Sequence, residues 1–97
     1  MKIAITGANG RVGQALVAHL QRCGHDVIPL TRAAFDLAAV DEIYEHLKLL
    51  DFDYLLNPAA MSAPDLCESQ RDLCERVNTL APARMASFCA AQGKKMI

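Results

Sequence analysis

The first thirteen residues, Met1–Gly13, constrain the fold more than any other stretch of the chain. Lys2–Thr6 is a short apolar run, which is typical of a buried parallel strand. Three glycines at a regular spacing, Gly7, Gly10 and Gly13, follow at once, and a helical pattern follows them. A strand, a glycine turn and a helix in this order begin a βαβ unit, so the sequence predicts an α/β fold.

The glycine turn has the composition of a phosphate-binding loop. Gly7 lets the chain turn off the strand, Gly10 lets a pyrophosphate approach the backbone, and Gly13 lets the helix pack close to the strand. The N–H groups and the positive dipole end at the helix start would face the anion. A branched residue at position 10 would fill that space and resist positive φ. The spacing is G-x-x-G-x-x-G rather than G-x-G-x-x-G, so a purely structural turn is the alternative; the strand–turn–helix context favours a dinucleotide.

Composition excludes several classes of protein. The chain has 97 residues, enough for one domain or a part of one, and 53% of them are hydrophobic, which argues against disorder. Ten basic and eleven acidic residues give a net charge of −1, without the basic stripe of a nucleic-acid-binding surface. No apolar run reaches the roughly 18–20 residues of a membrane span, and no signal peptide is visible. We therefore expect a cytoplasmic protein.

The four cysteines show no metal-binding spacing. They form no C-x-x-C motif and have no paired histidines near them, so no metal site is predicted. Cys67 and Cys74 lie seven positions apart. We expect small buried apolar groups in a reducing compartment rather than a redox pair.

The remaining pattern predicts three more strands and three helices. The strands are expected at 26–31 and 53–57, with a fourth opening at 94–97; Pro29 would interrupt the first of these or shorten it. The helices are expected at 11–23, 38–50 and 70–92, the last kinked or split in two by Pro82. A loop is expected at 61–69. Together they predict a Rossmann-like parallel sheet in the order 3-2-1-4, with helices on both faces, cut after the start of strand 4.

The end of the second strand indicates which cofactor is preferred. In NAD-binding units an acidic residue there usually holds the ribose 2′-hydroxyl, but this chain has Thr31 followed by Arg32. Arginine can grip a 2′-phosphate through a charge-assisted pair, which favours NADP, with NAD as the alternative. Arg32 stacking on adenine or facing solvent is the other interpretation. Asp36 is expected to be a turn or capping residue.

Several short motifs, in their order, resemble one family. They are Thr6–Gly13, the 24–28 segment Gly-His-Asp-Val-Ile, the 35–37 segment Phe-Asp-Leu, the 57–60 segment Asn-Pro-Ala-Ala, and the 77–82 segment Val-Asn-Thr-Leu-Ala-Pro. Together they resemble the extended short-chain dehydrogenase/reductase family, in its dTDP-4-dehydrorhamnose reductase branch. The resemblance runs along nearly the whole chain.

The resemblance implies roles for the matching residues. Asn78 would support the catalytic region through the adjacent strand. Four groups of residues would bind, in this order, the pyrophosphate, the adenosine 2′-phosphate, the adenine and the nicotinamide-side ribose. The residues implied to bind the cofactor are Gly7, Asn9, Gly10, Arg11, Val12 and Gly13; Thr31 and Arg32; Asp36 and Leu37; and Ala59, Ala60 and Met61.

Three departures from the family pattern limit what this chain can do. Pro58 stands where alanine is usual, and Met61 stands where tyrosine is frequent. The family's Ser/Thr and Tyr-x-x-x-Lys groups would lie beyond the fourth strand, and the Tyr44–Lys48 match lies on the wrong helix to be catalytic. Residues 1–97 are thus expected to be the N-terminal part of an NAD(P)-binding domain, without the catalytic and substrate-binding parts.

The implied function is an NADP-preferring reductase of a nucleotide-linked keto sugar, inactive as these 97 residues alone. The alternative is a non-catalytic dinucleotide-binding regulatory or structural subunit of the same fold. The partners are the dinucleotide and a nucleotide-sugar substrate, without nucleic acid or membrane. A homodimer is compatible with the sequence, which does not fix the oligomeric state.

Overall fold

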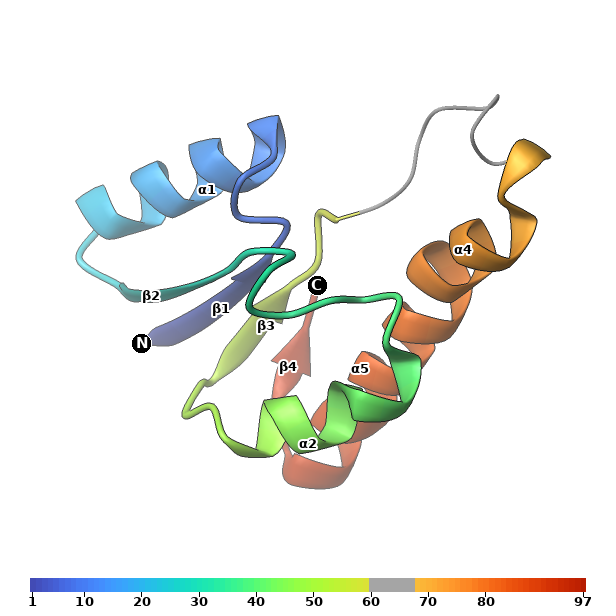
Figure 1. Cartoon of the computed structure of the whole chain (residues 1–97). Coiled ribbons are helices and arrows are strands. Elements are labelled where there is room, and N and C mark those ends of the chain that lie inside the picture. The colour runs from blue at the N-terminus through green and yellow to red at the C-terminus, as the bar shows by residue number, and fades with distance from the viewer. Residues whose placement is uncertain (60–67) are drawn as a thin grey trace.

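Four parallel strands form the centre of the structure, a computed structural model that describes residues 1–59 and 68–97 (Figure 1). The order across the sheet is β2-β1-β3-β4. The strand β1 lies between two neighbours, and Ala4 and Ile5 at its centre are fully buried, as expected for a central parallel strand. The strands are β1 (Lys2–Thr6), β2 (Asp26–Leu30), β3 (Tyr54–Leu56) and β4 (Lys95–Met96).

Helices cover both faces of this sheet, as predicted. The helix α1 (Arg11–Arg22) lies on one face, and α2 (Ile43–Lys48) packs with α5 (Ala81–Gln92) on the other (Figure 1). A short 3-10 turn, η1 (Val40–Glu42), leads into α2. The predicted α/β class and the Rossmann-like parallel sheet are therefore confirmed.

The predicted strand order, 3-2-1-4, is wrong. After β2 the chain crosses back over β1, and β3 pairs with the other side of β1, with Ile3 opposite Tyr54. Asp53 N donates to Lys2 O at 2.8 Å and extends this pairing. Only one strand, β2, lies on the first side of β1. After α2 the chain enters β3 on the other side of β1, so the direction of winding reverses there. Strand β1 is therefore flanked on both sides, and the sheet edges among the described strands are β2 and β4.

The main core lies between the sheet and the α2–α5 layer. Phe52, Leu55 and Phe88 are almost fully buried there, and Tyr44 meets the Phe88 ring edge-on at a centroid distance of 5.6 Å. The α1 face is less covered. Gly13 is the buried residue of α1, and Val12, in the first turn of the helix, is 59% exposed.

The prolines and glycines differ in how they affect the element boundaries. Pro29 does not interrupt β2, which runs through it with Pro29 opposite Ile5, so the predicted interruption is wrong. Pro29 is exposed and stands in β2, an edge strand, where a missing N–H is tolerated. Pro82 lies at the start of α5, and the chain before it widens into a π-helical turn, η2 (Arg76–Leu80), which continues from α4 (Arg71–Glu75). Gly93 has φ +68° and ends α5 in the left-handed conformation. The predicted 61–69 loop lies outside the described residues except for Glu68 and Ser69, which form a helical turn.

The cysteine prediction is confirmed only in part. Cys89 is buried, and burial raises the pKa of its thiol. Cys23 is exposed, so its predicted burial is wrong. Cys74 is buried but takes part in a disulfide bond, so it is not the reduced group that was expected. Cys67 lies outside the described residues.

Candidate functional site: a glycine turn at the switch point of the sheet

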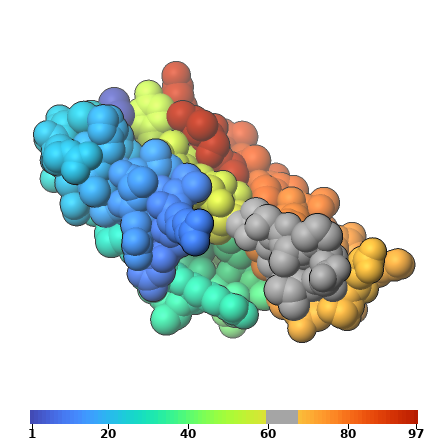
Figure 2. Space-filling model, turned by 90° about the horizontal axis from the view of Figure 1, so that it is seen from above, coloured from blue at the N-terminus to red at the C-terminus, as the bar shows by residue number. Residues whose placement is uncertain are grey.

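The predicted cofactor-binding residues that the structure describes follow the strands β1, β2 and β3 at the carboxyl edge of the sheet, where the winding reverses between β1 and β3. Figure 2 shows the turn after β1 in blue beside the yellow end of β3. The turn also touches β2, since Ala8 N donates to Leu30 O at 3.2 Å. Open α/β sheets bind ligands outside the carboxyl ends of their strands at such a reversal point.

Two of the three glycines are required by the backbone conformation and packing of the turn, independently of any ligand. Gly7 has φ +58°, and a Cβ added there would lie 2.9 Å from Ala59 Cβ. A Cβ on Gly13 would lie 2.0 Å from Gly7 O, a separation that no real pair of these atoms shows. The predicted sharp turn at Gly7 and close helix packing at Gly13 are therefore confirmed.

The middle glycine has no comparable structural requirement. Gly10 has φ −76° and ψ 170°, an extended conformation that any residue adopts, so the prediction of positive φ there is wrong. Among the described residues, a Cβ on Gly10 would meet only Gly7 O, at 3.3 Å. The absence of a side chain at Gly10 keeps the space before the helix open, which is what the approach of a phosphate to the backbone requires.

The start of α1 presents unpaired backbone donors to that space. Gly10 is the N-cap and has no side chain to cap the helix, and the first helical hydrogen bond runs from Gln14 N to Gly10 O. The N–H groups of Arg11, Val12 and Gly13 come before this bond and have no partner within the helix. The first turn contains no acidic residue. A helix start of this kind attracts anions through its N–H groups and its dipole.

The side chains around this turn add donors rather than carboxylates. Gln14 Nε2 donates to Asn9 O at 3.1 Å, which orients the loop backbone at Asn9. Arg11 is exposed, and no described residue forms an ion pair with it. The electrostatic field at the start of α1 therefore favours negative charge.

The segment after β2 places a second arginine at the same edge. Thr31 O accepts hydrogen bonds from Ala34 N at 3.1 Å and from Phe35 N at 2.8 Å, which forms a tight turn. Arg32 lies exposed in this turn, and its guanidinium forms no ion pair with any residue in 1–59 or 68–97. It is therefore free to pair with a phosphate at the edge of the sheet.

Asp36 and Leu37, the residues expected beside adenine, have structural roles. Asp36 Oδ1 accepts from Ala38 N at 3.0 Å, which confirms the predicted turn role. Leu37 is 7% exposed and belongs to the core, so only its backbone could meet a ligand. The adenine contact itself stays a prediction.

The end of β3 supplies the other wall of the site. Ala59 is half-buried beside Gly7, while Ala60 and Met61 lie outside the described residues. Thr6 Oγ1 donates to Asn57 Oδ1 at 2.6 Å and joins the ends of β1 and β3. This pair was not predicted, although both residues are polar and both lie at the ends of neighbouring strands.

Asn78, the expected supporting residue, lies in the π-helical turn. Its Nδ2 donates to Cys74 Sγ at 3.6 Å, one turn earlier. Such turns are frequent at functional sites, and the supporting role stays a prediction. The rejected Tyr44–Lys48 match is not at the site: Tyr44 packs on Phe88, and Lys48 pairs with Glu45 at 3.2 Å.

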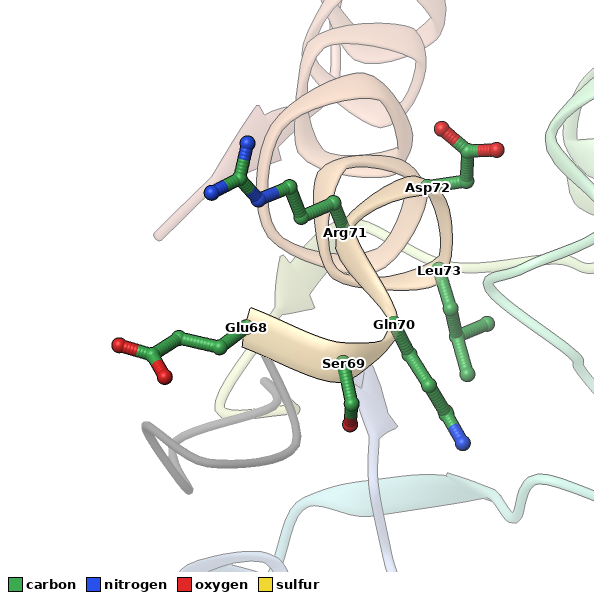
Figure 3. Close-up of a pocket in the computed structure, with 6 residues that line it drawn as sticks. All are labelled: Glu68, Ser69, Gln70, Arg71, Asp72 and Leu73. Atoms are coloured by element: carbon green, nitrogen blue, oxygen red, sulfur yellow. The ribbon is translucent and has the colours of Figure 1, made fainter.

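A separate cavity of about 410 Å³ lies at the start of α4. Figure 3 shows the residues that line it. Among the described residues it is lined by the stretch 68–73, and none of these residues was predicted to bind a ligand. Among the described residues no group of three or more metal-ligating side chains occurs, and no helix there is long and apolar enough to cross a membrane. The glycine turn is therefore the candidate site.

Comparisons with known proteins agree with this architecture. The RmlD substrate binding domain family matches residues 1–97, the whole chain. The dTDP-4-dehydrorhamnose reductase of Mycobacterium tuberculosis is 33% identical over 99% of this chain and 31% of its own length. A crystal structure of a dTDP-4-dehydrorhamnose reductase from Clostridium acetobutylicum is 31% identical with a TM-score of 0.90, over 99% of this chain and 34% of that one.

A third relative shares the fold at lower identity. The dTDP-4-dehydrorhamnose reductase of Bacillus anthracis, solved in complex with NADP, is 24% identical with a TM-score of 0.86, over 98% of this chain and 34% of that one. The chain thus spans about a third of the length of these relatives. The match over the whole chain and the shared fold establish that the chain belongs to the RmlD substrate binding domain family.

Proposed function

We propose that residues 1–97 form the dinucleotide-binding part of an NAD(P)-dependent reductase that acts on a nucleotide-linked keto sugar. One observation carries the proposal: the start of α1 is open, because Gly10 has no side chain to cover it and the first turn contains no acidic residue. Its donors suit a pyrophosphate. Family membership supports the reaction class, because the named relatives are dTDP-4-dehydrorhamnose reductases.

The residues of this chain would bind and orient the cofactor rather than transfer a proton. A nicotinamide dinucleotide supplies a hydride to a carbonyl carbon when it is bound. The turn from Gly7 to Gly13 would hold the pyrophosphate, and Arg32 would pair with a 2′-phosphate, so we infer a preference for NADP. Asp36, Leu37 and Ala59, with Ala60 and Met61, would line the rest of the dinucleotide.

The two tyrosines are badly placed to be the proton donor. Tyr44 packs in the core, and Tyr54 begins β3 at the opposite end from the glycine turn. We therefore expect the 97-residue chain alone to show no NADPH oxidation with any nucleotide-linked keto sugar. Substrate-dependent oxidation by the purified chain would contradict this.

Titration of the natural protein that contains this chain with NADPH and NADH tests the proposal directly. Binding of a dinucleotide, together with turnover of a nucleotide-linked keto sugar, is the expected result. Failure to bind either dinucleotide would refute it. Binding without turnover of any such sugar would favour the non-catalytic subunit instead. The cytoplasmic location and the homodimer stay predictions.

A further inference from the structure

One side-chain hydrogen bond at the candidate site has a consequence for the bound cofactor. Thr6 Oγ1 donates to Asn57 Oδ1 at 2.6 Å. Thr6 ends β1, Asn57 follows β3, and the register that pairs Ile5 with Leu56 puts the two residues side by side. Thr6 is 1% exposed, so water does not compete for its hydroxyl. The contact therefore fixes which way the Asn57 amide faces.

With its oxygen turned toward Thr6, the amide turns its NH₂ group away from β1. Asn57 N is already used, since it donates to Ile97 O at 3.0 Å. Within residues 1–59 and 68–97 no hydrogen bond uses Asn57 Nδ2. No buried side-chain nitrogen or oxygen in that part of the chain lacks a partner, so this NH₂ group is at least partly exposed rather than orphaned in the core. It is a held donor that a ligand can reach.

The position of Asn57 indicates which half of a dinucleotide it would meet. Arg32 follows β2, on one side of β1, whereas Asn57 follows β3, on the other side. A dinucleotide crosses such a sheet edge at the reversal point with its pyrophosphate at the glycine turn. With adenosine on the β2 side, the nicotinamide half lies over β3.

Resting on the proposed function, we propose that Asn57 Nδ2 donates a hydrogen bond to an acceptor oxygen of the nicotinamide-side half of the dinucleotide. Thr6 is its positioning residue, because its hydroxyl holds the amide in the orientation that presents the NH₂ group. A pair that served only to join two strands would need the Asn57 oxygen but not its free NH₂ group. The two roles can therefore be separated by changing one atom.

The variant Asn57→Asp makes that separation in the natural protein. It keeps an oxygen to accept from Thr6 but removes the donor. The probes are NADPH and adenosine 2′,5′-bisphosphate, which has the phosphorylated adenosine half without nicotinamide. We expect NADPH to bind about three- to tenfold more weakly, adenosine 2′,5′-bisphosphate to bind within about twofold of wild type, and Tm to be unchanged.

The bisphosphate is also the control for the added charge. A carboxylate that only repels phosphates would weaken both ligands alike, and that result would overturn the proposal, as would unchanged NADPH affinity. If the wild-type protein binds neither ligand, the proposed function itself fails. If it binds both and the variant does not distinguish them, only this inference fails.

The pair Thr6→Val and Thr6→Ser tests the positioning role. Valine removes the hydroxyl at nearly the same volume, and serine retains it. We expect Thr6→Val to weaken NADPH more than adenosine 2′,5′-bisphosphate, and Thr6→Ser to restore the wild-type ratio of the two affinities. A loss of Tm in Thr6→Val without a change in that ratio would leave the contact with only a structural role and overturn the proposal.

Discussion

At the amino end of the sheet, polar groups pair with one another, whereas at the carboxyl end several donors have no partner within the described residues. The Lys2 ammonium pairs with Asp51, and Lys2 N donates to Asp53 Oδ2 at 2.9 Å. Asp26 N donates to Met1 O at 3.0 Å. The amino end therefore ties β1 to both of its neighbours.

The carboxyl end combines tight packing with open donors. Gly7 and Gly13 are packed so closely that neither can take a side chain, whereas a Cβ on Gly10 between them would lie 3.3 Å from Gly7 O. The N–H groups at the start of α1 and the guanidinium of Arg32 face outward. One sheet can thus use its two ends separately. Internal pairing at the amino end sets the strand register, and a rigid turn at the carboxyl end holds donors for a ligand.

The largest expected effect is on stability and separates two glycines of the same turn. Gly13→Ala puts a Cβ 2.0 Å from Gly7 O, and a backbone oxygen held by the turn cannot move aside. We expect a loss of about 3 kcal/mol or more in the free energy of unfolding. Gly10→Ala is the matched control, with a contact at 3.3 Å, and should change it by less than about 1 kcal/mol. Equal losses in urea denaturation would contradict the packing argument.

The next effect is on binding. Gly10→Val should weaken dinucleotide binding on the order of a hundredfold, about 2.7 kcal/mol, because branched atoms would fill the space of the pyrophosphate oxygens. The extended conformation of Gly10 accepts valine, so Tm should fall little. Ala18→Val, on the exposed side of α1, is the control and should bind normally. If calorimetry shows that Gly10→Val binds the dinucleotide with unchanged affinity, the loop is only a structural turn.

The sequence predicted what depends on local pattern. The apolar run of β1, the glycine turn and the helix ends before Gly24 and Gly93 each follow from the backbone preferences of neighbouring residues, and each is present. Pro82 lies at the start of α5, where the helical stretch continues from η2. The place of the candidate site also follows, because a glycine turn after a parallel strand must lie at its carboxyl end.

Strand order could not be predicted in this way. Which side of β1 receives β3 depends on where the 31–53 connection packs, and local sequence pattern does not encode that choice. The Thr6–Asn57 contact depends on that order, since the two residues are neighbours only when β3 pairs with β1. The exposure of Val12 likewise depends on where α1 begins relative to the sheet edge.

A smaller effect tests the arginine after β2. Arg32→Ala should weaken NADPH about ten- to a hundredfold, the value of a charge-assisted hydrogen bond, and weaken NADH much less. Thr31→Asp should shift the preference toward NADH, because a carboxylate repels the 2′-phosphate. Titrations need one fixed salt concentration, since the contact is partly screened. Arg22→Ala, at the far end of α1, is the control. Equal weakening of both cofactors would mean that Arg32 stacks on adenine.

The smallest expected effect lies at the amino end. The hydrogen bond to Lys2 lowers the pKa of Asp51 below 3.8, and the same bond raises the pKa of Lys2 above 10.5. The ion pair therefore makes its full contribution to stability at pH values between 3.8 and 10.5. Its contribution is lost as the pH falls from 3.8 through the lowered pKa of Asp51, or rises from 10.5 through the raised pKa of Lys2. Because both groups are exposed, we expect Asp51→Asn to lower Tm at neutral pH only slightly, to lose this difference in high salt, and to leave dinucleotide affinity unchanged. A changed affinity would mean that the two ends of the sheet do not act separately.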